Sequence, residues 1–109
     1  MSDDASFADC NEPTTPPPEG ALVRSLPIIN RKGLHARATA KFVQCVELFE
    51  AKITVSRCGE TVGGDSIMGI LMLGAGMGTS ITVTATGAQA KDALDALAAL
   101  VANRFGEDE

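Results

Sequence analysis

The sequence is poor in aromatic residues, because its 109 residues include no tryptophan, no tyrosine and only four phenylalanines. Domains that bind single-stranded nucleic acid stack bases on aromatic side chains, so this composition disfavours that function. Hydrophobic residues still make up 45 % of the chain, which is enough for one core built from Leu, Ile, Val and Ala. Length and composition together predict one small folded domain.

Patterns that bind metals or form disulfide networks are absent as well. The three cysteines, Cys10, Cys45 and Cys58, and the single histidine lack the spacing of a four-ligand zinc site. The odd number of cysteines and the lack of a CxxC pair argue against a disulfide framework and favour thiols in a reducing compartment. We therefore expect no metal and no cofactor.

Segments that would direct the chain to a membrane are also missing. No hydrophobic run approaches the length of a transmembrane helix, and the first residues lack the basic and apolar regions of a secretory signal. We therefore expect a cytoplasmic protein with no membrane partner.

The charged residues are unevenly distributed along the chain. Residues 1–20 contain five acidic side chains, several prolines and no lysine or arginine, and residues 107–109 are all acidic. We expect a disordered acidic, proline-rich extension over 1–20, a folded domain over 21–106 and a short acidic tail over 107–109. The folded part carries nine basic and six acidic groups, which favours a phosphate or an acidic protein surface as partner and is weak for nucleic acid.

The spacing of apolar residues predicts an α+β fold. Alternating patterns predict strands over 22–29, 51–57, 61–62 and 79–85, and three- to four-residue spacing predicts helices over 36–49, 67–73 and 88–104. Pro27 cannot donate to a sheet ladder, so the first strand should lie at an edge. The resulting β-α-β-β-α-β-α order predicts an open-faced two-layer sandwich, with a four-stranded antiparallel sheet covered on one face by three helices.

The only histidine, His35, stands where the first helix should begin. Gly33 precedes it, Arg37 follows it, and the helix N-terminus offers unpaired N–H groups that attract anions. A neutral imidazole is a good nucleophile toward phosphorus near neutral pH. A guanidinium can donate two parallel hydrogen bonds to two oxygens of one phosphate. This segment therefore predicts a site that carries a phosphoryl group.

The run Gly33-Leu34-His35-Ala36-Arg37 resembles the active-site motif of HPr, the histidine phosphocarrier of the phosphoenolpyruvate-dependent phosphotransferase system (PTS). Residues 22–104 resemble that family throughout. The resemblance implies that His35 accepts a phosphoryl group on Nδ1 from enzyme I and passes it to a IIA-type domain, and that Arg37 contacts the phosphate. It also implies a phosphorylated intermediate rather than an enzyme. The family usually has proline where this chain has Ala38, and in a first helical turn alanine should fold equally well.

Ser66 lies just before the second predicted helix and should cap it. The resemblance matches Ser66 to the family's regulatory serine, which the HPr kinase/phosphorylase phosphorylates. The helix after it is apolar on all sides, so part of it should be exposed and available for docking. The resemblance implies that this helix and the start of the first helix bind the partners of a monomeric protein. The residues assigned to this surface are Ala36, Ile67, Met68, Leu71 and Met72.

Two other functions compete with the phosphocarrier interpretation. One is a regulatory interaction module of the same fold that acts through Ser66 and the helix over 66–73 without phosphoryl relay; the presence of His35 and Arg37 favours the carrier. The other is a small nucleic-acid-binding domain, which the lack of Tyr and Trp and the slight basic excess disfavour. The sequence does not distinguish a sugar-uptake pathway from a regulatory one.

Overall fold

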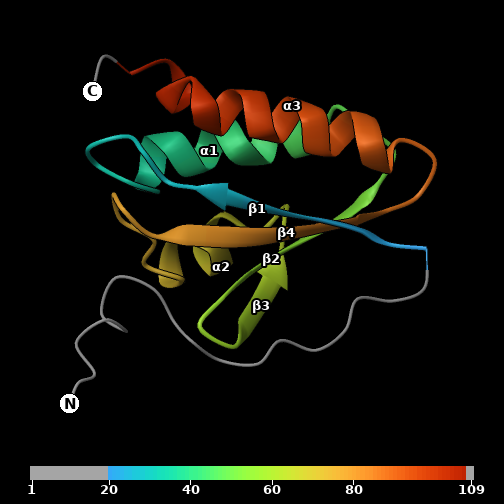
Figure 1. Cartoon of the computed structure of the whole chain (residues 1–109), viewed down its shortest axis with the longest axis horizontal. Coiled ribbons are helices and arrows are strands. Elements are labelled where there is room, and N and C mark those ends of the chain that lie inside the picture. The colour runs from blue at the N-terminus through green and yellow to red at the C-terminus, as the bar shows by residue number, and fades with distance from the viewer. Residues whose placement is uncertain (1–19, 108–109) are drawn as a thin grey trace.

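The computed structural model of the chain describes residues 20–107. Four strands and three α-helices follow one another in the predicted order, and a short 3₁₀ turn follows the last helix (Figure 1). The elements are β1 (Leu22–Pro27), α1 (Ala36–Val46), β2 (Lys52–Arg57), β3 (Glu60–Gly63), α2 (Ile67–Met72), β4 (Ser80–Thr86), α3 (Ala90–Ala102) and η2 (Arg104–Gly106). The predicted α+β class and element order are confirmed.

The four strands form one antiparallel sheet in the order β1-β4-β2-β3. Strand β1 lies at one edge, as the proline predicted, with Pro27 opposite Ser80 at the end of the ladder. Strand β4 lies between β1 and β2 and places Val83 opposite Arg24 on one side and Val55 on the other. The centre of the sheet is therefore formed by strands that are distant in sequence.

The core lies between one face of the sheet and the helices. Strand β4 alternates strictly between buried and half-buried positions, and its inward residues are Ile81, Val83 and Ala85. Helices α1 and α3 pack against each other and lie side by side above the sheet (Figure 1). A single cluster of apolar side chains joins the helices to the sheet, which confirms the two-layer sandwich.

Some element boundaries differ from the prediction. Helix α1 ends at Val46 rather than near residue 49, because the N–H groups of Leu48 and Phe49 bond to carbonyls three residues back, as in a 3₁₀ turn. In β1, Leu22 is 41 % exposed, whereas Leu26 is buried. Leu22 begins an edge strand, where less of the helical layer covers it.

The cysteines do not all behave as expected. Cys45 is a free thiol whose pKa is raised by burial, but Cys58 is disulfide-bonded, so the expectation of free thiols is wrong at that position. Within residues 20–107, no helix is long and apolar enough to cross a membrane, and no three His, Cys, Asp or Glu side chains are grouped so as to hold a metal ion. The predicted extension, up to residue 19, lies outside the described part of the chain.

Candidate functional site

The loop before α1 is fixed by a close approach to the segment after α2. Gly33 has a φ of +67°, and a Cβ atom there would lie 2.6 Å from the Ala75 carbonyl oxygen. The next residue, Leu34, donates its N–H to that same oxygen at 2.9 Å. Only glycine combines this backbone conformation with this proximity, so Gly33 lets the two segments hold His35 at a defined place.

His35 is the N-cap residue of α1. Its backbone is extended (φ −81°, ψ −178°), and its ring Nδ1 accepts the Arg37 backbone N–H at 3.3 Å. Its carbonyl accepts the first helical hydrogen bond, from the N–H of Thr39 at 2.8 Å. The ring is 26 % exposed. The helix start therefore directs a lone pair of the ring toward the unpaired N–H groups of α1.

The other ring nitrogen contacts the C-terminal segment. Nε2 lies 2.5 Å from Oε2 of Glu107, and Oε1 of the same carboxylate accepts from Asn30 Nδ2 at 3.1 Å. Burial acts to raise the pKa of Glu107, but the hydrogen bonds from His35 and Asn30 and the positive charges of His35 and Lys32 outweigh it and lower that pKa. Glu107 is therefore ionised at neutral pH, and each of its carboxylate oxygens has a hydrogen-bond partner.

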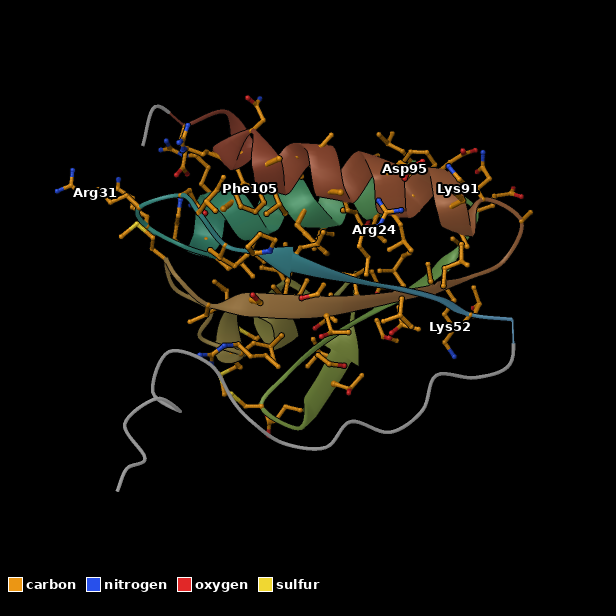
Figure 2. The ribbon with its side chains drawn as sticks, viewed as in Figure 1. Arg24, Arg31, Lys52, Lys91, Asp95 and Phe105 are labelled. Carbon is orange, nitrogen blue, oxygen red and sulfur yellow. The ribbon has the colours of Figure 1, made fainter. Side chains whose placement is uncertain are left out.

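A left-handed turn brings Glu107 back to α1. Arg104, Phe105 and Gly106 all have positive φ, at 53°, 55° and 80°. The first two are not glycine, and each such conformation costs on the order of 1–3 kcal/mol. The Phe105 side chain is only 1 % exposed, and Lys41 Nζ donates to the Phe105 carbonyl at 2.6 Å. These contacts hold the turn at the end of the α1–α3 layer (Figure 2).

Basic side chains surround this site without covering it. Arg37 is exposed, and its guanidinium has no hydrogen bond or ion pair to any residue in the described range. Lys32 is also exposed, and Arg31 extends outward from the tip of the loop before α1 (Figure 2). The exposed positive charges of Arg37 and Lys32 can therefore attract an incoming anion.

Ser66 is the N-cap residue of α2, as predicted. Its Oγ accepts the backbone N–H of Gly69 at 3.0 Å, and its own backbone is extended (φ −103°, ψ 102°). The residue is half-buried, so part of Ser66 remains accessible to solvent while its side chain caps the helix.

The helix after Ser66 divides its apolar residues between core and surface. Ile70 is fully buried, whereas Ile67, Met68 and Met72 are 43 %, 68 % and 75 % exposed. Leu71 is half-buried, and Ala36 is exposed at the start of α1, which packs against α2. We call Ala36, Ile67, Met68, Leu71 and Met72 the docking surface; their exposure fits that role, which stays a prediction.

Sequence reasoning missed two residues of the site, Asn30 and Glu107. Asn30 was not singled out, and Glu107 was assigned to an acidic tail without a role. Glu107 is 72 positions from the histidine it contacts, and no motif links them. The one available signal was chemical, since a histidine with a defined ring orientation usually has a partner at each nitrogen.

Comparisons with known proteins identify the family of this chain. The family model described as "PTS HPr component phosphorylation site" matches residues 22–103. The phosphocarrier protein HPr of Cupriavidus necator is 49 % identical over 88 residues, which cover 81 % of this chain and 99 % of that protein.

Solved structures show the same fold. HPr-C-His from Thermoanaerobacter tengcongensis is similar with a TM-score of 0.77 and 36 % identity, covering 81 % of this chain and 99 % of that one. A phosphocarrier protein HPr from Bacillus anthracis is similar with a TM-score of 0.73 and 41 % identity, covering 76 % and 99 %. With this agreement in sequence and fold, the chain belongs to the HPr family of the phosphotransferase system.

Proposed function

We propose that His35 is the phosphoryl-carrying residue of this chain and that Nδ1 is the atom that forms the bond to phosphorus. As a member of the HPr family, the chain is a phosphocarrier that receives a phosphoryl group from enzyme I and delivers it to a IIA-type domain. It is a phosphorylated intermediate and not a catalyst. The observation that carries the assignment is the lone pair of Nδ1, which accepts the Arg37 N–H at the start of α1.

The transfer step follows from this orientation. The Nδ1 lone pair leaves the Arg37 N–H and attacks phosphorus, an N–P bond forms, and the bond from phosphorus to the donor breaks with its electron pair remaining on the donor. The phosphoryl oxygens then lie near the N–H groups of the first turn of α1, which stabilise negative charge by about 0.3–1 kcal/mol. The Arg37 guanidinium, which is exposed, can fork onto two of these oxygens. Such modest stabilisation suits a group that must be passed on.

The test is phosphorylation of the purified chain by enzyme I, magnesium and phosphoenolpyruvate. We expect one acid-labile phosphoryl group on the wild type and none on His35→Ala. Arg37→Ala should fold normally, because the exposed Arg37 side chain has no hydrogen bond or ion pair within residues 20–107. It should transfer more slowly in at least one direction, because the phosphoryl oxygens lose the guanidinium. Phosphorylation of His35→Ala to the wild-type extent would refute the assignment.

A regulatory role is proposed for Ser66. Its hydroxyl caps the N-terminus of α2, a helix whose Met68 is exposed, and phosphate on it adds about two negative charges without unfolding the helix. A kinase of the HPr kinase/phosphorylase type would use it to weaken the binding of an acidic partner. Intact-mass analysis after incubation with such a kinase should show one phosphate on the wild type and none on Ser66→Ala; an unmodified wild type would refute this role.

The docking surface is proposed to bind enzyme I, the IIA domain and the kinase in turn. Methionine side chains suit a surface that must fit several partners. Met68→Glu should weaken binding to enzyme I at unchanged stability, since Met68 is 68 % exposed. We further propose that the chain is a monomer of the cytoplasm, with one folded domain over 21–106; a concentration-independent mass in sedimentation would support the monomer.

A further inference from the structure

The contact between Glu107 and His35 has no part in the function proposed above, and it joins two residues that are far apart in the sequence. Each carboxylate oxygen has its own donor, His35 Nε2 at 2.5 Å and Asn30 Nδ2 at 3.1 Å. The Glu107 side chain is only 17 % exposed. A carboxylate held from both sides and shielded from water has a fixed position, unlike an acidic residue in a solvated tail.

Asn30 anchors this carboxylate to the loop before the helix. Its side chain is completely buried, and its Nδ2 also donates to the Gly33 carbonyl at 2.8 Å. Both neighbours of this amide group are acceptors, so its NH₂ must face them and its oxygen must face away. Oδ1 accordingly has no partner among the described residues. Asn30 Oδ1 thus lacks a hydrogen bond, while Nδ2 of the same side chain donates both to the Glu107 carboxylate and to the Gly33 carbonyl.

The two contacts of the ring require the same tautomer. An ionised carboxylate can only accept, so Nε2 must carry a proton. Nδ1 accepts the Arg37 N–H, so it must carry the lone pair. The Nδ1–H tautomer would lose both hydrogen bonds and direct two hydrogens at each other.

We propose that Glu107 is a positioning residue, which holds the proton on Nε2 so that the nucleophilic lone pair stays on Nδ1. This inference rests on the proposed function of His35. When the N–P bond forms, the proton remains on Nε2, and the ring becomes cationic. The Glu107 carboxylate then lies against that positive charge, on the opposite edge of the ring from the phosphoryl group. Glu107 thus acts on the ring in the manner of the carboxylate in a Ser-His-Asp triad, without contact to the transferred group.

The test combines ring spectroscopy with transfer rates on the full chain. In ¹⁵N-labelled unphosphorylated protein at mildly alkaline pH, long-range ¹H–¹⁵N correlations distinguish the two tautomers of His35. We expect the wild type and the control Glu60→Gln, which removes an exposed charge on β3, to show the Nε2–H tautomer alone. Glu107→Ala should show both tautomers. Glu107→Gln should shift the population further toward Nδ1–H, because an amide that accepts from Asn30 presents its NH₂ to Nε2.

Transfer rates should follow the tautomer populations. We expect phosphorylation of Glu107→Ala and Glu107→Gln by phosphorylated enzyme I to be slower by about tenfold, because the smaller Nε2–H population and the loss of the carboxylate beside the cationic ring both lower the rate, with the control unchanged. A pure Nε2–H ring in both Glu107 variants, or transfer at the wild-type rate, would overturn the positioning role while leaving His35 as the acceptor. If the wild type itself takes no phosphoryl group, the proposed function fails, and the ring spectra still decide whether Glu107 sets the tautomer.

Discussion

Two glycines with the same φ allow a measurement of how much the close approach of residues 75–76 constrains the loop before α1. Gly33 and Gly74 both have a φ of +67°, but a Cβ on Gly33 would lie 2.6 Å from the Ala75 oxygen and 2.7 Å from the Gly76 Cα, whereas a Cβ on Gly74 would meet nothing within 4 Å. The matched substitutions Gly33→Ala and Gly74→Ala therefore share a conformational penalty and differ in steric overlap.

The expected magnitudes follow from these distances. A Cβ in the left-handed region costs about 1–2 kcal/mol, and the lower entropy of the unfolded chain returns about 0.4–1 kcal/mol. Gly74→Ala should therefore lose about 1 kcal/mol. At Gly33 the colliding atoms belong to the backbone and cannot rotate away, which adds about 1–3 kcal/mol. We expect a total loss of about 2–4 kcal/mol for Gly33→Ala.

Urea unfolding of the two variants and the wild type measures this difference, provided that the dependence on urea stays the same. Phosphorylation by enzyme I adds a second readout, since displacement of Leu34 from the Ala75 oxygen also displaces His35, and a 1 Å error in geometry can cost about a hundredfold in rate. Gly74→Ala should transfer normally. Equal destabilisation of the two variants would show that the loop does not approach residues 75–76 as closely as described.

Further predictions concern the caps and the C-terminal turn. Ser66→Ala should lower the free energy of unfolding by about 1 kcal/mol, because the Gly69 N–H loses its acceptor; an unchanged urea midpoint would contradict the cap. Ala38→Pro should change stability by less than about 1 kcal/mol, because the N–H it removes lies in the first turn; a loss of several kcal/mol would contradict that placement. Phe105→Ala should cost about 3–5 kcal/mol in thermal or urea unfolding, and a loss below 1 kcal/mol would mean that the ring is not buried. The pKa of Glu107 in the folded protein lies below its ordinary value of 4.5. The stabilisation that ionised Glu107 provides is therefore complete above pH 4.5 and declines as the pH falls through the folded pKa. The difference in unfolding free energy between the wild type and Glu107→Gln should shrink in acid, and a constant difference would contradict the contact.

The fold was predictable because each element shows a clear hydrophobic period. The alternation in β4 and the three- to four-residue spacing in α1 and α3 survive in the structure, and the element order follows from them. The position of His35 at a helix start was equally local, since a glycine, a histidine and an amphipathic run lie within a few residues. The end of α1 was less predictable, because Leu48 and Phe49 continue the apolar pattern after the helix has tightened into a 3₁₀ turn.

The other half of the site depends on a long-range contact that no local pattern encodes. Glu107 reaches His35 only because Arg104 and Phe105 adopt left-handed conformations, which neither residue type indicates. The buried Phe105 ring and the Lys41 hydrogen bond hold that turn, and both depend on the packed arrangement of α1 and α3. The contact of Nδ1 with the helix start, which was predicted, thus depends on local sequence, whereas the contact of Nε2 with Glu107, which was not, depends on tertiary packing.

The course of the chain after α3 has a practical consequence for experiments on this protein. A purification tag joined shortly after Glu107 would start close to the carboxylate that contacts the His35 ring. Histidine tags are the least suitable, since their imidazoles would compete for Glu107 and add acceptors of the same chemistry. Kinetic work should therefore use material without a tag after Glu107, and assays on material tagged there should be repeated after the tag has been removed.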